Sequence, residues 1–135
     1  MGSEMCIRDS SIISKMGSRI GFIQLNEKKA LAAAAELNRR LVGVKEYICL
    51  VTEPYKRKCK IVDRPEGCKV IVKKSATPPR AAIFYKGSFE LLQVDSLSNE
   101  DCVVAILNTG ADKIMIASIY TVSYTHLTLP TNREV

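Results

Sequence analysis

The chain has 135 residues, of which 47% are hydrophobic and 25% are charged, and this composition is typical of one soluble globular domain. No apolar run approaches the roughly 18 residues of a membrane-spanning helix, and no secretory signal opens the chain, so we expect a nuclear or cytoplasmic protein without a membrane partner. The five cysteines show no Cys-x-x-Cys spacing, which argues against a zinc site. A formal net charge of +6 favours anionic partners such as nucleic acid.

The two ends of the chain look foreign to the rest of it. Residues 5–9 (Met-Cys-Ile-Arg-Asp) can be encoded by ATG TGT ATA AGA GAC, and the reverse complement of that string encodes residues 122–126 (Val-Ser-Tyr-Thr-His). The two segments resemble a transposase mosaic end, a DNA element used in sequencing libraries, translated in its two orientations. The alternative is that two unrelated pentapeptides have complementary codons by chance. We therefore predict that residues 1–10 and 122–135 are adapter-like and not native, and that residues 11–121 are the native segment.

The first half of the native segment predicts a β-α-β unit. Residues 19–25 have the pattern of a buried strand, residues 27–41 that of a helix ending near Gly43, and residues 47–52 that of a second strand. The apolar face of the predicted helix contains Ala30, Ala34, Leu37, Leu41 and Val44. Strands of such a unit are parallel and joined by a right-handed crossover, so both should end at the same edge of a sheet.

The second half predicts short strands. A polar excursion over residues 54–79 is broken by proline and glycine, and it contains one apolar run, residues 68–72, that suggests a short strand. A meander of four strands then follows, over residues 81–85, 89–94, 102–107 and 113–120, with a hairpin turn at residues 108–112. Together with the β-α-β unit, these strands predict an α/β (α+β) domain whose mixed sheet is covered by a helix.

Three of the apolar runs end in a polar residue of catalytic type. Asn26 follows the first strand, Glu53 follows the second, and Tyr120 closes the last. If the carboxyl ends of these strands meet at one edge, an amide, a carboxylate and a phenol converge on one point. A metal-assisted phosphodiesterase requires such a set.

Four short motifs carry a resemblance to a known family. They are Gln24-Leu25-Asn26, residues 50–55 (Leu-Val-Thr-Glu-Pro-Tyr), residues 79–83 (Pro-Arg-Ala-Ala-Ile) and residues 117–120 (Ala-Ser-Ile-Tyr). In this order they resemble the endonuclease/exonuclease/phosphatase superfamily, and within it the apurinic-type endonuclease domain of retrotransposons that lack long terminal repeats. The resemblance covers about residues 19–120. It implies a DNase I-like four-layer α/β/β/α sandwich, of which this chain would be the N-terminal half.

The resemblance also implies chemical roles for the three strand-end residues. Glu53 would hold Mg²⁺, for which Mn²⁺ could substitute, Asn26 would help to form the metal site and orient the phosphate, and Tyr120 would donate its hydroxyl to a phosphate oxygen. Each residue has a structural alternative. Glu53 could be a solvated glutamate, Asn26 could cap the helix that begins next to it, and Tyr120 could be a half-buried aromatic residue.

Basic residues cluster after Glu53. They are Lys56, Arg57, Lys58, Lys60, Lys69, Lys73, Lys74 and Arg80. We predict that Lys56, Arg57, Lys58 and Arg80 contact nucleic acid, with the Arg80 guanidinium facing a phosphate. The alternative is a solvated lysine-rich surface that binds no nucleic acid.

The resemblance implies that the parent domain nicks DNA by metal-dependent phosphodiester hydrolysis, so that the freed 3′ end primes reverse transcription, and that a reverse transcriptase follows in the same polyprotein. The later Asp-x-Asn and Asp-His elements of the family are absent, and the single histidine, His126, lies in the predicted adapter tail. We therefore expect a truncated, inactive fragment. The alternatives are a basic nucleic-acid-binding module without catalysis, an assembly by-product without function, and another branch of the superfamily that acts on phosphoinositide or sugar phosphates.

Overall fold

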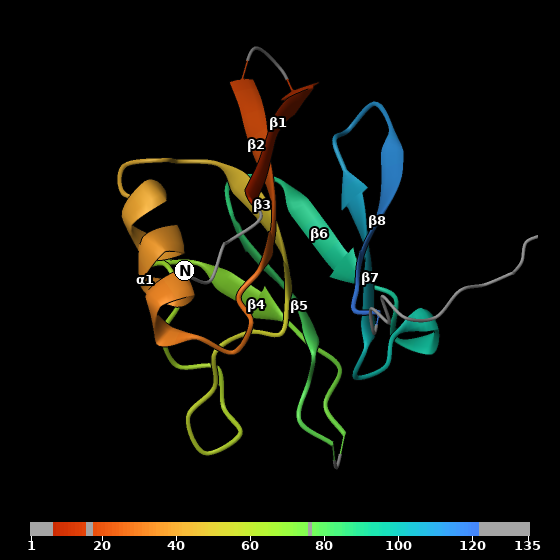
Figure 1. Ribbon diagram of the computed structural model, residues 1–135. Helices are drawn as coiled ribbons and strands as arrows, with labels where there is room; N and C mark the ends of the chain where they lie inside the picture. Colours follow the sequence, from red (N-terminus) through yellow and green to blue (C-terminus); the bar gives the residue numbers. More distant parts are fainter. Residues whose placement is uncertain (1–6, 16–17, 76, 122–135) are drawn as a thin grey trace, which may run out of the picture.

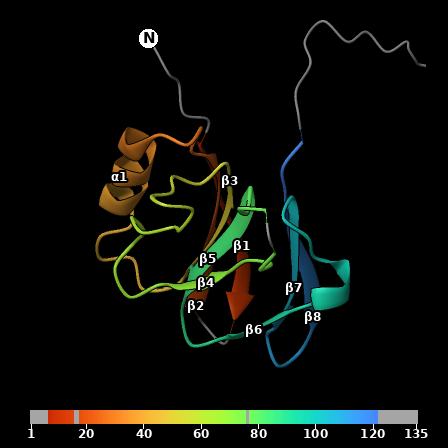
Figure 2. The ribbon, with the colours of Figure 1, turned by 90° about the horizontal axis from the view of Figure 1, so that it is seen from below.

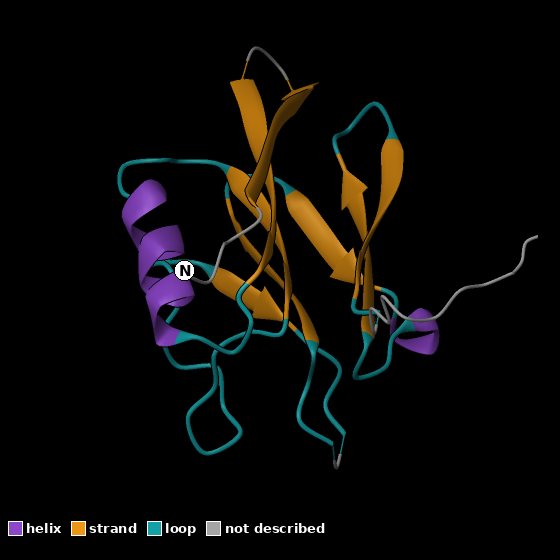
Figure 3. Cartoon of the chain, in the orientation of Figure 1, coloured by secondary structure: helices purple, strands orange, loops and turns teal. Residues whose placement is uncertain are grey.

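The computed structural model describes residues 7–15, 18–75 and 77–121, with side chains from residue 20 onward. Two β-sheets and a helix make up this part of the chain (Figure 1; Figure 3). In chain order, the elements are β1 (Ile7–Lys15), β2 (Ser18–Asn26), α1 (Leu31–Arg40), β3 (Tyr47–Thr52), β4 (Lys69–Ile71), β5 (Ala81–Lys86), β6 (Glu90–Gln93), a 3₁₀ turn (Asp95–Leu97), β7 (Cys102–Asn108) and β8 (Lys113–Ile119). Within these residues, no helix has the length and apolar character needed to cross a membrane.

The first sheet contains five strands in the order β1-β2-β3-β5-β4. β2 and β3 are parallel and connected through α1, with Asn26 paired to Thr52, whereas the other neighbours in this sheet are antiparallel. The predicted β-α-β unit and mixed sheet are therefore confirmed. Because the two central strands run in the same direction, both end at the same edge of the sheet.

The second sheet is an antiparallel meander in the order β6-β7-β8, and it contains the predicted hairpin between β7 and β8. The prediction that residues 81–85 belong to the same meander is wrong, because β5 pairs with β3 and β4 in the first sheet. All of residues 81–84 are buried. Burial of consecutive residues is typical of a strand that is covered on both faces, which is the position that β5 has.

The molecule consists of three layers, in the order α1, five-stranded sheet and three-stranded sheet (Figure 2). Alternate residues of the central strands point to opposite faces, so the five-stranded sheet contributes to two cores. The helix-side core consists of Leu25, Leu37, Leu41, Tyr47, Cys49, Val51, Ala82 and Phe84. The inter-sheet core includes Ile20, Ile48, Ile83, Val103, Leu107 and Ile116. These layers correspond to three of the four layers of the expected α/β/β/α sandwich.

The helix is shorter than the sequence predicts. It begins at Leu31 and not at residue 27, because Lys28 and Lys29 have φ of 51° and 57° and form a turn in which the Ala30 N–H donates to the Glu27 carbonyl. Its buried face is close to the predicted one, with Ala34 and Leu37 fully buried. The predicted face extends too far, since Val44 lies beyond the helix and is 37% exposed.

Strand β1 is absent from the prediction. Its first residues lie in the predicted adapter-like segment 1–10, and the expected boundary after residue 10 falls inside this strand, which pairs with β2 over its length. The origin of segment 1–10 therefore stays a prediction. The remaining adapter-like positions, residues 1–6 and 122–135, lie outside the described residues.

Gly87 lies in the connection where the chain passes from the first sheet to the second, and replacing it by alanine is expected to destabilise the fold by about 1–3 kcal/mol. Its φ is +154°, and an added Cβ would lie 2.2 Å from the ring of Phe89, which packs against the inter-sheet core. Gly110→Ala is the matched control, because Gly110 has φ of +94° but nothing within 4 Å of an added Cβ. Urea unfolding measures both changes. If the two variants lose the same free energy of unfolding, the contact with Phe89 makes no contribution to the effect of Gly87→Ala.

Candidate functional site

The carboxyl ends of β2, β3 and β8 meet at one edge of the molecule, which we call the rim and define by Asn26, Thr52, Glu53 and Tyr120. Asn26 pairs with Thr52 across the parallel strands, and Glu53 follows Thr52 directly. Tyr120 follows β8 and lines a cavity of about 270 Å³ together with Asn26 and Thr52. The structure thus brings the predicted amide, carboxylate and phenol to the same edge. Their chemical roles stay predictions.

A buried hydrogen bond holds the two sheets together just below the rim. The Ser118 hydroxyl donates to the Val51 carbonyl oxygen at 3.0 Å, and Ser118 is 2% exposed. Val51 lies two residues before Glu53, and Ser118 lies two residues before Tyr120. This bond therefore fixes the position of β8 relative to β3, and with it the position of the phenol relative to the carboxylate.

Asn26 stabilises a turn and does not cap the helix. Its side-chain Oδ1 accepts a hydrogen bond from the Lys28 N–H at 2.7 Å. The residue at the N-cap position of α1 is Ala30, without a side-chain capping bond. The capping alternative from the sequence is therefore wrong, since the left-handed turn at Lys28 and Lys29 separates Asn26 from the helix. With Oδ1 engaged, the amide presents its Nδ2 group as a donor.

Glu53 has an unusual backbone conformation that its neighbours hold in place. Its φ is +46°, a left-handed value that costs a non-glycine residue free energy and that occurs often at functional sites. The Glu53 N–H donates to the Arg80 carbonyl at 2.8 Å, and its carbonyl accepts from the Lys29 N–H at 2.9 Å. The next residue, Pro54, is buried. These contacts fix the backbone from which the half-exposed Glu53 side chain projects.

Glu27, directly after Asn26, is a buried carboxylate beside the rim that the sequence pattern does not indicate. It is 1% exposed, and its Oε1 accepts the Tyr55 N–H at 2.8 Å, so it ties the turn after β2 to the turn after β3. Its Oε2 is also buried and has no hydrogen-bond partner among the described protein atoms. Burial raises the pKa of this carboxyl from the ordinary 4.5 to about 7, against the effect of the Tyr55 hydrogen bond. No pattern pointed to Glu27, because a glutamate before two lysines resembles an exposed helix start.

Arg80 is held at the rim by Asp101. Its guanidinium makes a two-point ion pair with the Asp101 carboxylate through Nε and Nη2, which lowers the pKa of that carboxyl. The same guanidinium lies over the Tyr120 ring, 5.5 Å from the ring centroid. The sequence predicts that the Arg80 guanidinium faces a phosphate. In the structure the charge is shared with the Asp101 carboxylate and lies beside the Tyr120 phenol, and the phosphate contact stays a prediction.

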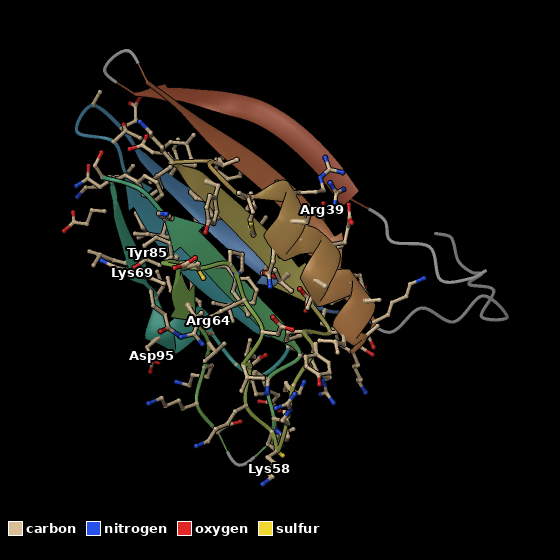
Figure 4. All side chains as sticks on the ribbon, turned by 90° about the vertical axis from the view of Figure 1, so that its left-hand side faces the viewer. Arg39, Lys58, Arg64, Lys69, Tyr85 and Asp95 are labelled. Carbon is tan, nitrogen blue, oxygen red and sulfur yellow. The ribbon has the colours of Figure 1, made fainter. Side chains whose placement is uncertain are left out.

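The basic residues after Glu53 fall into two groups. Arg57 and Lys58 are exposed in a tight turn closed by the Arg57 and Lys60 backbones, in which Lys58 and Cys59 have φ of 54° and 65°. Figure 4 shows Lys58 at the end of this loop. Lys56 is directed inward, and its Nζ donates to the Pro79 carbonyl at 2.8 Å. Burial, and then the nearby charge of Lys29, lower the pKa of the Lys56 ammonium.

The donor atoms at the rim suit a hard divalent cation in part. Glu53 offers one carboxylate, and Asn26 offers an amide oxygen that already accepts the Lys28 N–H. Mg²⁺ is commonly held by one or two carboxylates together with waters and substrate phosphate oxygens. Among the residues that the structure describes, no three His, Cys, Asp or Glu side chains form a group that could hold a metal ion. The residues present therefore fit one side of a magnesium site, and further ligands would have to come from substrate, water or other protein groups.

Comparisons with known proteins identify the fold. No protein-family model matches this sequence, and no curated protein matches it. Among solved structures, the chain is similar to the "Endonuclease domain of TRAS1, a telomere-specific non-LTR retrotransposon", with a TM-score of 0.59 and 24% sequence identity over 74% of this chain. The match covers 43% of that domain, so the chain spans less than half of its length. The chain therefore has the fold of part of a retrotransposon endonuclease domain, as the sequence predicted.

Proposed function

We propose that the chain is the N-terminal part of an endonuclease domain from a retrotransposon without long terminal repeats. The complete domain would nick DNA by metal-dependent phosphodiester hydrolysis. The freed 3′ end would then prime reverse transcription by an enzyme encoded downstream. The observation that carries the proposal is the position of Asn26, Glu53 and Tyr120 at one rim of this fold. The partner we expect is DNA, which also agrees with the net charge of +6.

Each rim residue would have a distinct task. Glu53 would contribute the carboxylate ligand for Mg²⁺ or Mn²⁺, which when bound supplies charge neutralisation at the phosphate. The Tyr120 hydroxyl would donate to a phosphate oxygen, beside the positive charge that Asp101 holds over its ring. The Asn26 Nδ2 group would donate to a second phosphate oxygen, because its Oδ1 is already bound by Lys28.

We expect the chain by itself to show no magnesium-dependent nicking of supercoiled plasmid. Phosphodiester hydrolysis also needs a group that activates water and a group that assists the leaving oxygen. Among the described residues at the rim, Glu53 is the accessible carboxylate for these tasks, because the Asp101 carboxylate is paired with Arg80 and the Glu27 carboxylate is buried. Gel assays with and without Mg²⁺ measure this. Nicking that disappears on Glu53→Ala and persists on Asp112→Ala, a change in an exposed turn, would contradict the proposed inactivity.

The genomic DNA downstream of the Tyr120 codon tests the parent function directly. The proposal expects that codons for Asp-x-Asn and Asp-His elements follow in the same reading frame, and then a reverse transcriptase. A stop codon close to this position in the native gene would eliminate the polyprotein proposal. This experiment does not depend on whether the chain is active.

A second candidate function is a nucleic-acid-binding module without catalysis. The observation that favours it is the tight turn at residues 57–60, which presents Arg57 and Lys58 to solvent. In this case, salt-sensitive DNA binding would survive Glu53→Gln, because neutralising that side chain removes a metal ligand without removing a phosphate contact.

A further inference from the structure

A second cavity, of about 470 Å³, opens on the helix side of the five-stranded sheet, between the loop that follows the turn at residues 57–60 and the segment that includes β4. Its volume lies within the range of roughly 300–1,000 Å³ that is typical of small-molecule sites. Apolar side chains form its walls: Ile61, Val70, Val72, Pro78 and Pro79. Ile61, Val70 and Val72 pack against the helix-side core but are only partly buried, so apolar surface remains open to a ligand.

The same cavity is surrounded by positive charge. Its lining residues include Lys60, Arg64, Lys73 and Lys74, and no aspartate or glutamate is among them. Lys73 is paired with Asp95 at 2.7 Å, and Arg64 donates to the Ile61 carbonyl at 3.1 Å. Lys60 and Lys74 are exposed, and neither has an ion-pair partner among the residues that the structure describes. Figure 4 shows Arg64 beside this side of the sheet. The cavity thus has two uncompensated cations next to apolar walls.

The cavity and the rim are neighbours. Pro79 lines the cavity, and its carbonyl accepts the Lys56 Nζ at 2.8 Å. The following residue is Arg80, whose guanidinium lies over Tyr120. The Arg80 carbonyl in turn accepts the Glu53 N–H at 2.8 Å, so Pro79 and Arg80 connect the cavity to the rim.

We propose that this cavity binds a nucleotide, with its base against the apolar walls and its phosphate beside Lys60 and Lys74. A ligand that matches the cavity must combine an apolar body with negative charge, and a nucleoside phosphate has both. The source would be either a free nucleotide or an unpaired unit of a DNA strand. The choice of a DNA strand rests on the proposed function, and we expect this source because the cavity adjoins the rim.

The rate at which the Cys59 thiol is alkylated measures whether the cavity is occupied. Cys59 lines it, is exposed, and is a free cysteine, whereas Cys102 lies on β7 in the other sheet. We expect deoxyadenosine monophosphate to slow alkylation of Cys59 by roughly ten-fold at a nucleotide concentration ten times its Kd, and to leave Cys102 unchanged. Deoxyadenosine and inorganic phosphate at the same concentration should protect less, because each offers half of the required chemistry. Peptide mass spectrometry measures the alkylation at each site.

Two double variants with the same change in net charge distinguish binding at the cavity from a general effect of positive charge. Lys60→Gln with Lys74→Gln should weaken deoxyadenosine monophosphate binding by roughly three- to thirty-fold. Lys69→Gln with Lys113→Gln removes the same charge from exposed positions outside the cavity and should change binding by less than about two-fold. Isothermal titration calorimetry measures both. All four lysines are exposed, so both variants should keep the fold.

Three results would overturn the nucleotide site: no protection of Cys59 by the nucleotide, equal protection by inorganic phosphate, or equal weakening by both pairs of substitutions. A single-stranded oligodeoxynucleotide should displace the mononucleotide, and lack of displacement would overturn a DNA strand as the source. These measurements use no nicking assay and leave Glu53 intact. Failure of the endonuclease proposal and failure of the nucleotide site therefore give different results.

Discussion

Replacing Glu27 by glutamine is expected to stabilise the protein at about pH 8 and to leave its stability almost unchanged at about pH 4. The folded carboxyl has a pKa of about 7, above the ordinary value of 4.5, because it is buried. The folded state therefore holds its proton more tightly than the unfolded state does. Stability falls as the pH rises from 4.5 to 7, and the loss is complete above the folded pKa.

The difference between the ordinary pKa of 4.5 and the folded pKa of about 7 corresponds to a loss of about 3 kcal/mol in the free energy of unfolding at pH 8. Glutamine has a similar size and keeps an oxygen that can accept the Tyr55 N–H, so the variant removes the charge without removing the bond. Urea unfolding from about pH 4 to about pH 8 measures the difference. Glu66→Gln, at an exposed position, is the matched control and should follow the wild type. Parallel pH profiles for wild type and Glu27→Gln would show that the carboxyl ionises in the folded state without this cost.

Neutralising Arg57 and Lys58 together should weaken the binding of DNA by roughly five- to thirty-fold at low salt. Both side chains are exposed in the turn next to the rim, and each would release one counterion on contact with a phosphate. The slope of log affinity against log salt should become shallower by about 2 for the same reason. Fluorescence anisotropy with a labelled duplex at several salt concentrations measures both quantities.

The control for this experiment removes the same charge from the opposite end of the first sheet. Lys45 precedes β3 and Lys86 ends β5, where it pairs with Tyr47, so both exposed lysines lie away from the rim. Lys45→Gln with Lys86→Gln should leave the affinity within about two-fold of the wild type. If both pairs weaken binding equally, DNA responds to net charge alone and the turn is not a specific contact surface.

The left-handed conformations at the rim show where local pattern and tertiary structure disagree. Glu53, Lys28 and Lys29 all have positive φ, although none is glycine. Such values cost free energy, and here backbone hydrogen bonds between the two rim turns and Arg80 hold the chain in them. Periodicity cannot predict these conformations, because the bonds that stabilise them join segments about 25 residues apart.

The sequence by itself determined the β-α-β unit, the final hairpin and the location of the rim. Apolar periodicity identifies the strands, and parallel pairing through a helix obliges Asn26 and Glu53 to lie at the same edge. Only the tertiary structure decided that β5 joins the first sheet, that Arg80 pairs with Asp101, and that Glu27 is buried with a raised pKa. The physical reason is that these outcomes depend on which distant segments exclude water from a side chain, and residue spacing along the chain does not contain that information.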